Sequence, residues 1–330
     1  MSEAKPLPTK PIGVIASLAA GFDTVIQGWW VLFFPVIVDL FLWLGPHLSI
    51  TPVATRALDN LVSLAGENLE IEPLLQAVEE LNYFSVFSVT PLGVPSLMSL
   101  KLPQLTPIGS PVVLSVGSEL LWLTVFLGLS LCGLMAGGLY LGLIAQQVRD
   151  GRVDLPRLLG VLPRYWISIV ALIIILLLAV IILSIPVAVV AAILTAVSVW
   201  VATLVVWVSL MLFLWLLFHL FFTVHGMLLS DQPLFTAAWT SVRLMAFSSF
   251  SAMGLLALIL GIGTGLNYLW NLPQEDSWML LVGIAGHSVI TSGLVAATFV
   301  FYQDRFRYWQ ELREYLSQAA EAAVGKESDD

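Results

Sequence analysis

The fold is decided by residues 165–230, which read YWISIVALIIILLLAVIILSIPVAVVAAILTAVSVWVATLVVWVSLMLFLWLLFHLFFTVHGMLLS. These 66 residues contain no Asp, Glu, Lys or Arg. A run of this length without charge is tolerated only in lipid or in protein buried within lipid. At 1.5 Å per residue it spans about 99 Å, which predicts two membrane spans. The turn between them falls at Ser184–Pro186 or at Thr195–Ser198.

The composition of the whole chain agrees with this stretch. The 330 residues are 59% hydrophobic and 11% charged, whereas a soluble domain carries about 25% charged residues. The sequence therefore predicts an all-α, polytopic integral membrane protein. Its one cysteine, Cys132, excludes an intramolecular disulfide and a cysteine metal cluster.

Hydropathy divides the chain into six spans and their connections. Besides the two spans in residues 165–230, we expect spans at 28–45, 119–145, 247–270 and 278–302. The predicted organisation is a tail with an interfacial helix (1–27), the first span (28–45), an extracytoplasmic helical and Pro-rich segment (46–111), a bundle of five spans (112–315) and an acidic tail (316–330).

Residues 11–27 predict an amphipathic helix lying in the membrane plane. Helical spacing places one group of apolar residues together: Ile12, Ile15, Leu18, Phe22, Val25 and Trp29. Ser17, Thr24 and Gln27 fall on the other side. A signal peptide is the alternative, since Lys5 and Lys10 precede an apolar run. Two further in-plane pieces are expected, beginning at Pro156 and Pro233.

The segment 46–111 predicts two helices followed by an irregular stretch. Helical periodicity covers 53–64 and 71–81, and five prolines then interrupt 91–111. Because this stretch is too apolar to extend freely into water, we expect it to cover the outer ends of the helices.

Glycines predict the close helix contacts. The second span holds two G-x-x-x-G pairs, Gly133 with Gly137 and Gly138 with Gly142. Small residues let helix backbones approach closely in lipid. We expect the same packing role for Gly261 and Gly265 in the fifth span.

Basic residues predict the orientation of the spans. With the N-terminus inside, eleven Lys and Arg residues lie on the inner side and two, Arg56 and Lys101, on the outer side. An excess of basic residues marks the cytoplasmic face. We therefore expect a multi-pass protein of the plasma membrane with both termini in the cytoplasm.

Four ionisable residues in or at the ends of the spans are candidate functional residues: Asp39, Glu119, His219 and His287. Asp39 could form a proton relay with either histidine, or could cap helix ends at the outer surface. Each histidine could instead bridge two helices by a hydrogen bond. Glu119 begins the second span and is expected at the interface.

The third in-plane piece begins with Asp231, Gln232 and Pro233 and continues to Trp239, Ser241 and Arg243. This pattern resembles bacterial multipass membrane proteins similar to the membrane domain of glycerophosphodiester phosphodiesterases. The likeness covers about residues 145–315, although Trp239 precedes Ser241 here. It implies a fold and no catalytic residues, because the phosphodiesterase chemistry belongs to a separate soluble domain.

No catalytic, cofactor-binding, metal-binding or nucleic-acid motif is present in the sequence. The first functional hypothesis is a non-catalytic accessory protein that packs against membrane lipids or other membrane proteins. The alternative is a transporter or lipid-handling permease with Asp39, His219 and His287 near its path. A cavity reaching these residues would favour the permease, and a solid glycine-packed interior would favour the accessory protein.

Overall fold

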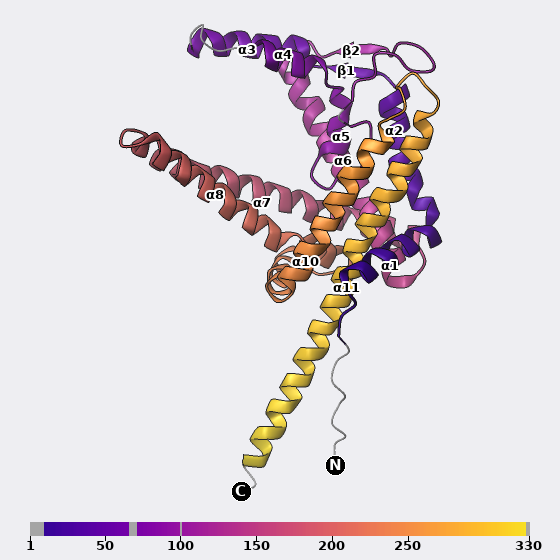
Figure 1. Cartoon of the computed structure of the whole chain (residues 1–330), viewed down its shortest axis with the longest axis vertical. Helices are drawn as coiled ribbons and strands as arrows, with labels where there is room; N and C mark the ends of the chain where they lie inside the picture. Colours follow the sequence, from indigo (N-terminus) through magenta and orange to yellow (C-terminus); the bar gives the residue numbers. More distant parts are fainter. Residues whose placement is uncertain (1–9, 66–70, 100, 328–330) are drawn as a thin grey trace.

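The structure is a computed structural model that describes residues 10–65, 71–99 and 101–327 (Figure 1). The side chains of 64, 65 and 320–327 are not described. The first nine residues of the predicted N-terminal tail and the last three of the acidic tail lie outside the described residues.

Within these described ranges, five helical stretches are long and apolar enough to cross a membrane. They are α6 (Glu119–Asp150), α7 (Leu155–Thr195), α8 (Val199–Leu220) continued by α9 (Thr223–Ser230), α10 (Leu234–Trp270) and α11 (Leu280–Glu327). A sixth span forms if α1 (Val14–Gln27) is joined to η1 (Trp29–Leu32) and α2 (Phe33–Leu44), with a bend of 90° between them. The chain is therefore a multi-span, all-α membrane protein, as predicted.

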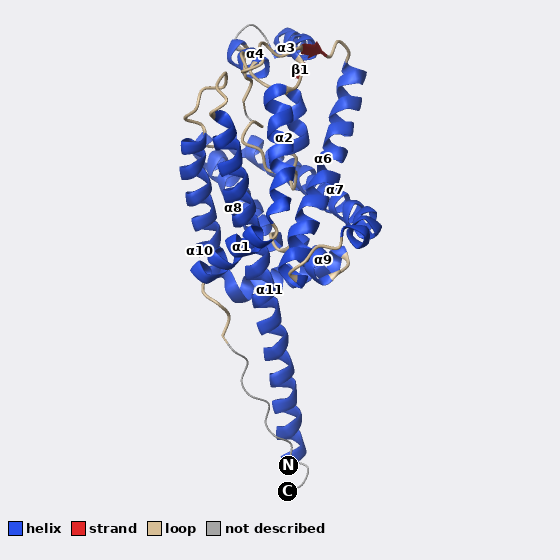
Figure 2. Cartoon of the chain, turned by 90° about the vertical axis from the view of Figure 1, so that its right-hand side faces the viewer, coloured by secondary structure: helices blue, strands red, loops and turns tan. Residues whose placement is uncertain are grey.

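Helices α2, α6, α10 and α11 run along the long axis of the molecule in both views (Figures 1 and 2). The hairpin of α7 and α8 leaves this bundle at a steep angle, on the left in Figure 1. Its turn lies at 196–198, so the second candidate turn is right and Ser184–Pro186 is wrong. Pro186 lies inside α7, where the Ser184 hydroxyl donates to the carbonyl of Ile181 at 2.9 Å.

The in-plane pieces are only partly separate from the spans that follow them. The chain bends after α1 at Gly28, and α10 is kinked at Ser248, where φ is −119° and ψ is 18°. The second piece is not separate: α7 continues from Leu155 into the span, with Pro156 in its first turn. Proline fits there because the first helical N–H groups have no partner within the helix.

Helix α1 packs against α11 through small residues. Ser17 and Gly21 are buried there, and Gly21 lies against the backbone of Ala297. The prediction of which side of α1 faces the protein is thus partly wrong, because Ser17 is fully buried while Ile15 is 78% exposed. Small side chains on this face allow the two helix axes to approach closely.

The segment after α2 forms α3 (Thr51–Ala65) and α4 (Glu72–Glu79), as its periodicity predicts. Both project sideways from the bundle, at the top left of Figure 1. Two short strands were not predicted: β1 (His47–Ser49) pairs in parallel with β2 (Val113–Ser115). This pairing joins the two ends of the segment.

Residues 86–99 enter the bundle, so the first part of the stretch 91–111, which was expected to cover the outer helix ends, lies among the helices instead. The segment begins with α5 (Val86–Val89), after η2 (Tyr83–Ser85), and then continues without regular structure. Val94 and Met98 are fully buried. Irregular backbone at this depth is tolerated where protein surrounds it or where it lines a cavity. We call residues 86–99 the re-entrant segment.

The two glycine pairs of α6 serve two different neighbours. A Cβ at Gly133 or Gly137 would overlap the backbone of the re-entrant segment, at Phe87 and Leu92 respectively. Gly138 and Gly142 instead lie against side chains of α7. The sequence therefore identified the close contacts of α6, but not that one partner is an irregular segment.

Gly261 and Gly265 have no close packing partner in the part of the chain that the structure describes. A Cβ at either glycine would meet nothing within 4 Å. Both lie on the outer side of α10, whereas Gly263 between them faces inward.

Candidate functional site

Asp39 holds the re-entrant segment in place. Its carboxylate is fully buried, and its Oδ1 accepts hydrogen bonds from the Ser96 hydroxyl at 2.5 Å and from the Met98 N–H at 2.9 Å. The Met98 N–H lies in irregular backbone and has no helical hydrogen bond, so Asp39 supplies the acceptor that this buried donor needs. One predicted role of Asp39, the capping of neighbouring backbone, is therefore present in the structure, although its partner is a non-helical segment.

The second carboxylate oxygen of Asp39 faces α11. Its Oδ2 lies 3.9 Å from Nδ1 of His287. Neither atom has a hydrogen-bond partner in the described part of the chain. Of the two histidines considered for a relay, the structure thus brings His287 to Asp39.

His219 and Glu119 lie elsewhere. His219 is buried, and its Nδ1 contacts the carbonyl oxygen of Trp215 at 2.9 Å on its own helix. It does not line the cavity described below. Glu119 is the exposed first residue of α6, where an acidic side chain is favoured by the helix dipole.

His287 lines a large cavity that is partly open to the surface. The cavity has a volume of about 970 Å³. Its walls come from the re-entrant segment and the residues after it, from α6 and α7, from α8 and α9, and from α10 and α11. On α11 the lining runs from His287 to Phe299, a helix length of roughly 18 Å. The cavity is thus large and elongated.

One end of the cavity is polar. Lys101, Asn267, Asn271 and His287 line it close to the α10–α11 turn. Lys101 pairs with Glu275 of that turn at 3.6 Å. The buried Oδ1 of Asn271 has no partner among the residues that the structure describes. A ligand placed here would meet a cation, two amides and an imidazole.

The middle of the cavity is apolar. Its lining includes Leu256, Ile259 and Leu294 in the bundle, with Leu172 and Leu176 contributed by α7. Beyond these residues lie His225 and Thr298, whose Nε2 and Oγ1 are 2.7 Å apart. Nδ1 of His225 has no hydrogen-bond partner among the described residues, so unpartnered polar atoms occur at both ends, whereas the cation Lys101 and the two asparagines lie at the Asn271 end.

Sequence reasoning missed most of the polar lining. Lys101 was counted only for topology, and Asn267, Asn271 and Thr298 were not singled out. One signal was available: Lys101 is one of only two basic residues in the segment 46–111. The asparagines carry no such signal, because a neutral amide near a span end is common at any membrane interface.

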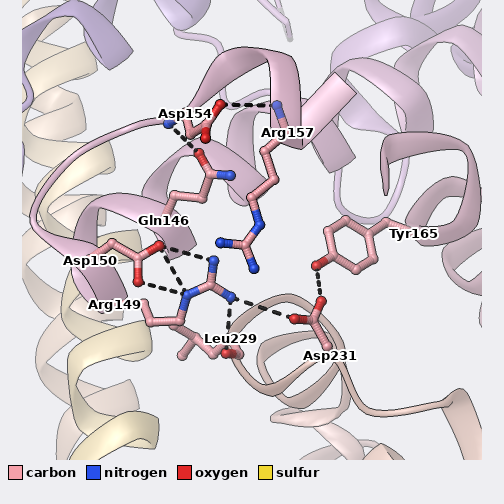
Figure 3. Close-up of polar contacts among 8 residues, drawn as sticks. All are labelled: Gln146, Arg149, Asp150, Asp154, Arg157, Tyr165, Leu229 and Asp231. Carbon is pink, nitrogen blue, oxygen red and sulfur yellow. Dashed lines mark hydrogen bonds and ion pairs between the residues drawn. The ribbon is translucent and has the colours of Figure 1, made fainter. Parts of the chain in front are cut away.

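A polar network fastens the base of the α7–α8 hairpin to the bundle (Figure 3). The Tyr165 hydroxyl of α7 donates to Asp231, which lies in the α9–α10 connection with a φ of 51°. Arg149 of α6 approaches the same carboxylate at 3.8 Å and donates to the carbonyl of Leu229 at 3.4 Å. Three elements therefore meet at Asp231.

The α6–α7 corner has its own bonds within this network. The Asp154 N–H donates to the side chain of Gln146, and the Asp154 carboxylate accepts from the Arg157 N–H, both at 3.0 Å (Figure 3). Asp154 is thus the N-cap of α7. The whole network orients the hairpin, which supplies one wall of the cavity.

The chain matches no protein-family model, no curated protein and no solved structure. The resemblance carried by residues 231–243 therefore stays a prediction.

Proposed function

We propose that this protein is a lipid-handling membrane protein that binds one amphipathic molecule in this partly open cavity. The observation that carries the proposal is the distribution of polarity along the cavity. Lys101, Asn267, Asn271 and His287 lie at one end, and leucine and isoleucine side chains line the middle. Ligand sites of about 300–1,000 Å³ that are mainly apolar, with a few polar groups, are typical of small-molecule binding.

A lipid fits this cavity because a lipid, like the cavity, has one polar end and a long apolar part. An acyl chain in the apolar part would remove hydrophobic surface from contact with water, which is favourable in proportion to the area buried. The headgroup would then lie beside Lys101, Asn267, Asn271 and His287. Polar groups that line a cavity lose free energy when they are covered without a hydrogen-bond partner, so a polar headgroup fits this end better than an acyl chain does.

The proposed orientation places the polar end of the cavity toward the extracytoplasmic side of a plasma membrane. Its support is the sequence asymmetry, in which eleven basic residues lie on one side and two on the other. In this orientation the headgroup lies in the outer half of the bilayer.

The alternative of a non-catalytic accessory protein draws support from the α7–α8 hairpin. Its tip exposes large apolar side chains, among them Val197 at 80% and Trp200 at 85%. A partner protein could cover them, but surrounding lipid covers them equally well. The hairpin therefore does not favour a protein partner, whereas the cavity supports a lipid ligand.

A pair of glycine substitutions tests the cavity. Gly263 lines it, and a Cβ there would meet only a Leu294 methyl group at 3.9 Å. Gly263→Phe would thus fill the cavity without a backbone clash. Gly265→Phe is the matched control, two residues away on α10, where a Cβ meets nothing within 4 Å.

The measurement is the affinity of the detergent-purified protein for a fluorescent phosphatidylglycerol. We expect Gly263→Phe to lose affinity at least about tenfold, which corresponds to about 1.4 kcal/mol, while Gly265→Phe binds as the parent does. Thermal unfolding confirms that both variants are folded. Equal affinity in all three proteins would mean that the ligand does not occupy this cavity.

A further inference from the structure

We propose that Asp39 and His287 share one exchangeable proton and that ligand binding in the cavity is linked to this proton. The inference rests on the proposed function, because it concerns the same cavity. It adds the chemical class of the ligand, an amphiphile with an anionic headgroup, and a dependence of its binding on pH.

The geometry of the pair is the first support. Asp39 has no exposed surface, and Oδ2 faces Nδ1 of His287 at 3.9 Å. An isolated ionised carboxylate in such a place is costly, and so is an isolated imidazolium. One proton held between the two groups gives a pair with no net charge. Whether that proton lies on the carboxylate or on the imidazole, the proton belongs to the pair.

Access to the proton is the second support. Asp39 is sealed from the cavity and from solvent, whereas His287 is 15% exposed and lines the cavity. Two side chains that contact Asp39, Ser96 and His287, therefore line the cavity, and of the two the imidazole is the group that can carry the proton. Histidine suits this task because its protonation changes near neutral pH.

Few other charges act on the pair. Helix α2 carries no other charged residue, and neither do residues 244–270 of α10 or 280–303 of α11. The nearby connections contribute Lys101, Glu275 and Asp276, of which Lys101 and Glu275 pair with each other at 3.6 Å. His47 follows α2, and His225 lines the opposite end of the cavity.

The coupling has a definite direction. An anionic headgroup beside Lys101 and His287 stabilises the protonated pair, so binding takes up a proton. By linkage, lowering the pH then strengthens binding. For one proton the affinity rises by up to about tenfold for each pH unit. Asp39 also accepts hydrogen bonds from Ser96 and Met98 of the re-entrant segment. A change in the protonation of Asp39 therefore also changes the hydrogen bonds that hold this wall of the cavity.

The test measures the affinity of the full-length protein for fluorescent phosphatidylglycerol between about pH 5.5 and 8.5, a range that brackets the usual histidine pKa. The phosphodiester stays ionised throughout, so a pH dependence comes from the protein. Proton uptake on binding is followed in weak buffer with an indicator dye. Phosphatidylcholine with the same acyl chains gives the comparison for a headgroup without net charge.

Three variants isolate the pair. Asp39→Asn keeps an acceptor for Ser96 and Met98 but cannot gain or lose a proton, and His287→Gln leaves the re-entrant segment untouched. His219→Gln is the matched control, a buried histidine outside the cavity lining. We expect a pH-dependent affinity and proton uptake in the parent and in His219→Gln. Asp39→Asn and His287→Gln should bind with an affinity that no longer depends on pH.

The failures are distinguishable. Absence of binding to the parent protein at every pH would remove the proposed function and this inference with it. Binding that is independent of pH in the parent would overturn the inference alone. So would a pH dependence that persists in both Asp39→Asn and His287→Gln, or equal affinity for the two lipids.

Discussion

The carbonyl oxygen of Leu92 lies directly against Gly137, in the space that any larger residue on α6 would need for its Cβ. A transmembrane helix and an irregular segment therefore pack backbone to backbone. Dispersion between closely packed atoms is the main attraction available in lipid. This contact seats the re-entrant segment, and with it the wall of the cavity.

Gly137→Ala should destabilise the protein by at least about 2 kcal/mol, because the added methyl group overlaps backbone that has no flexible end to move. Thermal unfolding in detergent is the measurement. Gly128→Ala on the same helix is the control, since a Cβ there meets nothing within 4 Å. Equal unfolding temperatures would show that the segment does not pack against α6 in this way.

Substitutions of Asp39 should separate its structural role from its charge. Asp39→Leu leaves the Met98 N–H and the Ser96 hydroxyl without their acceptor, which costs about 1–3 kcal/mol for each buried group. Asp39→Asn retains an acceptor oxygen and should be much closer to the parent in stability. Chemical or thermal unfolding compares the two, and a leucine variant as stable as the asparagine variant would contradict the capping role.

Loss of the Tyr165 hydroxyl should loosen the α7–α8 hairpin. Tyr165→Phe removes a hydrogen bond to Asp231 that joins α7 to the α9–α10 connection. Spin labels at positions 197 and 268, with Cys132 replaced by Ser, report the distance between the hairpin tip and the bundle. We expect a broader distance distribution than in the parent.

Thr203→Val is the control for this measurement, because the Thr203 hydroxyl donates only to Val199 of its own helix, at 2.9 Å. A distribution unchanged by Tyr165→Phe would mean that other contacts orient the hairpin.

His47, which lies outside the spans, should make the stability of the protein depend on pH. Burial lowers the pKa of His47 below its usual value, and the nearby Glu275 opposes this effect. The unfolded chain therefore takes up a proton at His47 at a higher pH than the folded chain does. The contribution of neutral His47 to stability is complete above about pH 6.5 and declines as the pH falls below it.

His47→Gln removes this dependence. As the pH is lowered from about 7.5 to 5.5, the parent protein should lose stability relative to the His47→Gln variant. Thermal unfolding of both proteins at each pH measures this difference. A difference that is constant over this range would indicate that His47 is protonated equally in both states.

The membrane class and the positions of the spans could be predicted because they depend on local composition. Residues 165–230 carry no charged side chain, which identifies them as membrane-embedded. The turn between their two helices follows the end of α7 at Thr195. The glycine pairs of α6 were also evident, since helical spacing alone puts Gly133 and Gly137 on one face. These features need no knowledge of distant parts of the chain.

The candidate site could be predicted only in part, because its contacts join distant residues. Asp39 and the two histidines were evident as ionisable groups in apolar spans, but nothing local distinguishes His287 from His219. That choice depends on which helix lies beside α2. The entry of residues 86–99 into the bundle was missed for a similar reason: their prolines indicate irregular backbone, and irregular backbone is ordinarily placed outside the membrane.

The contacts of Asp39 also impose an order of assembly on the growing chain. During synthesis Asp39 emerges first, Ser96 follows 57 residues later, and His287 arrives only with α11. Residues 33–44 are therefore made while Asp39 lacks these partners. A carboxylate in an apolar environment is costly until the re-entrant segment and α11 reach it. The proton site is thus completed by the last of the described helices, and any chain that stops before α11 lacks it.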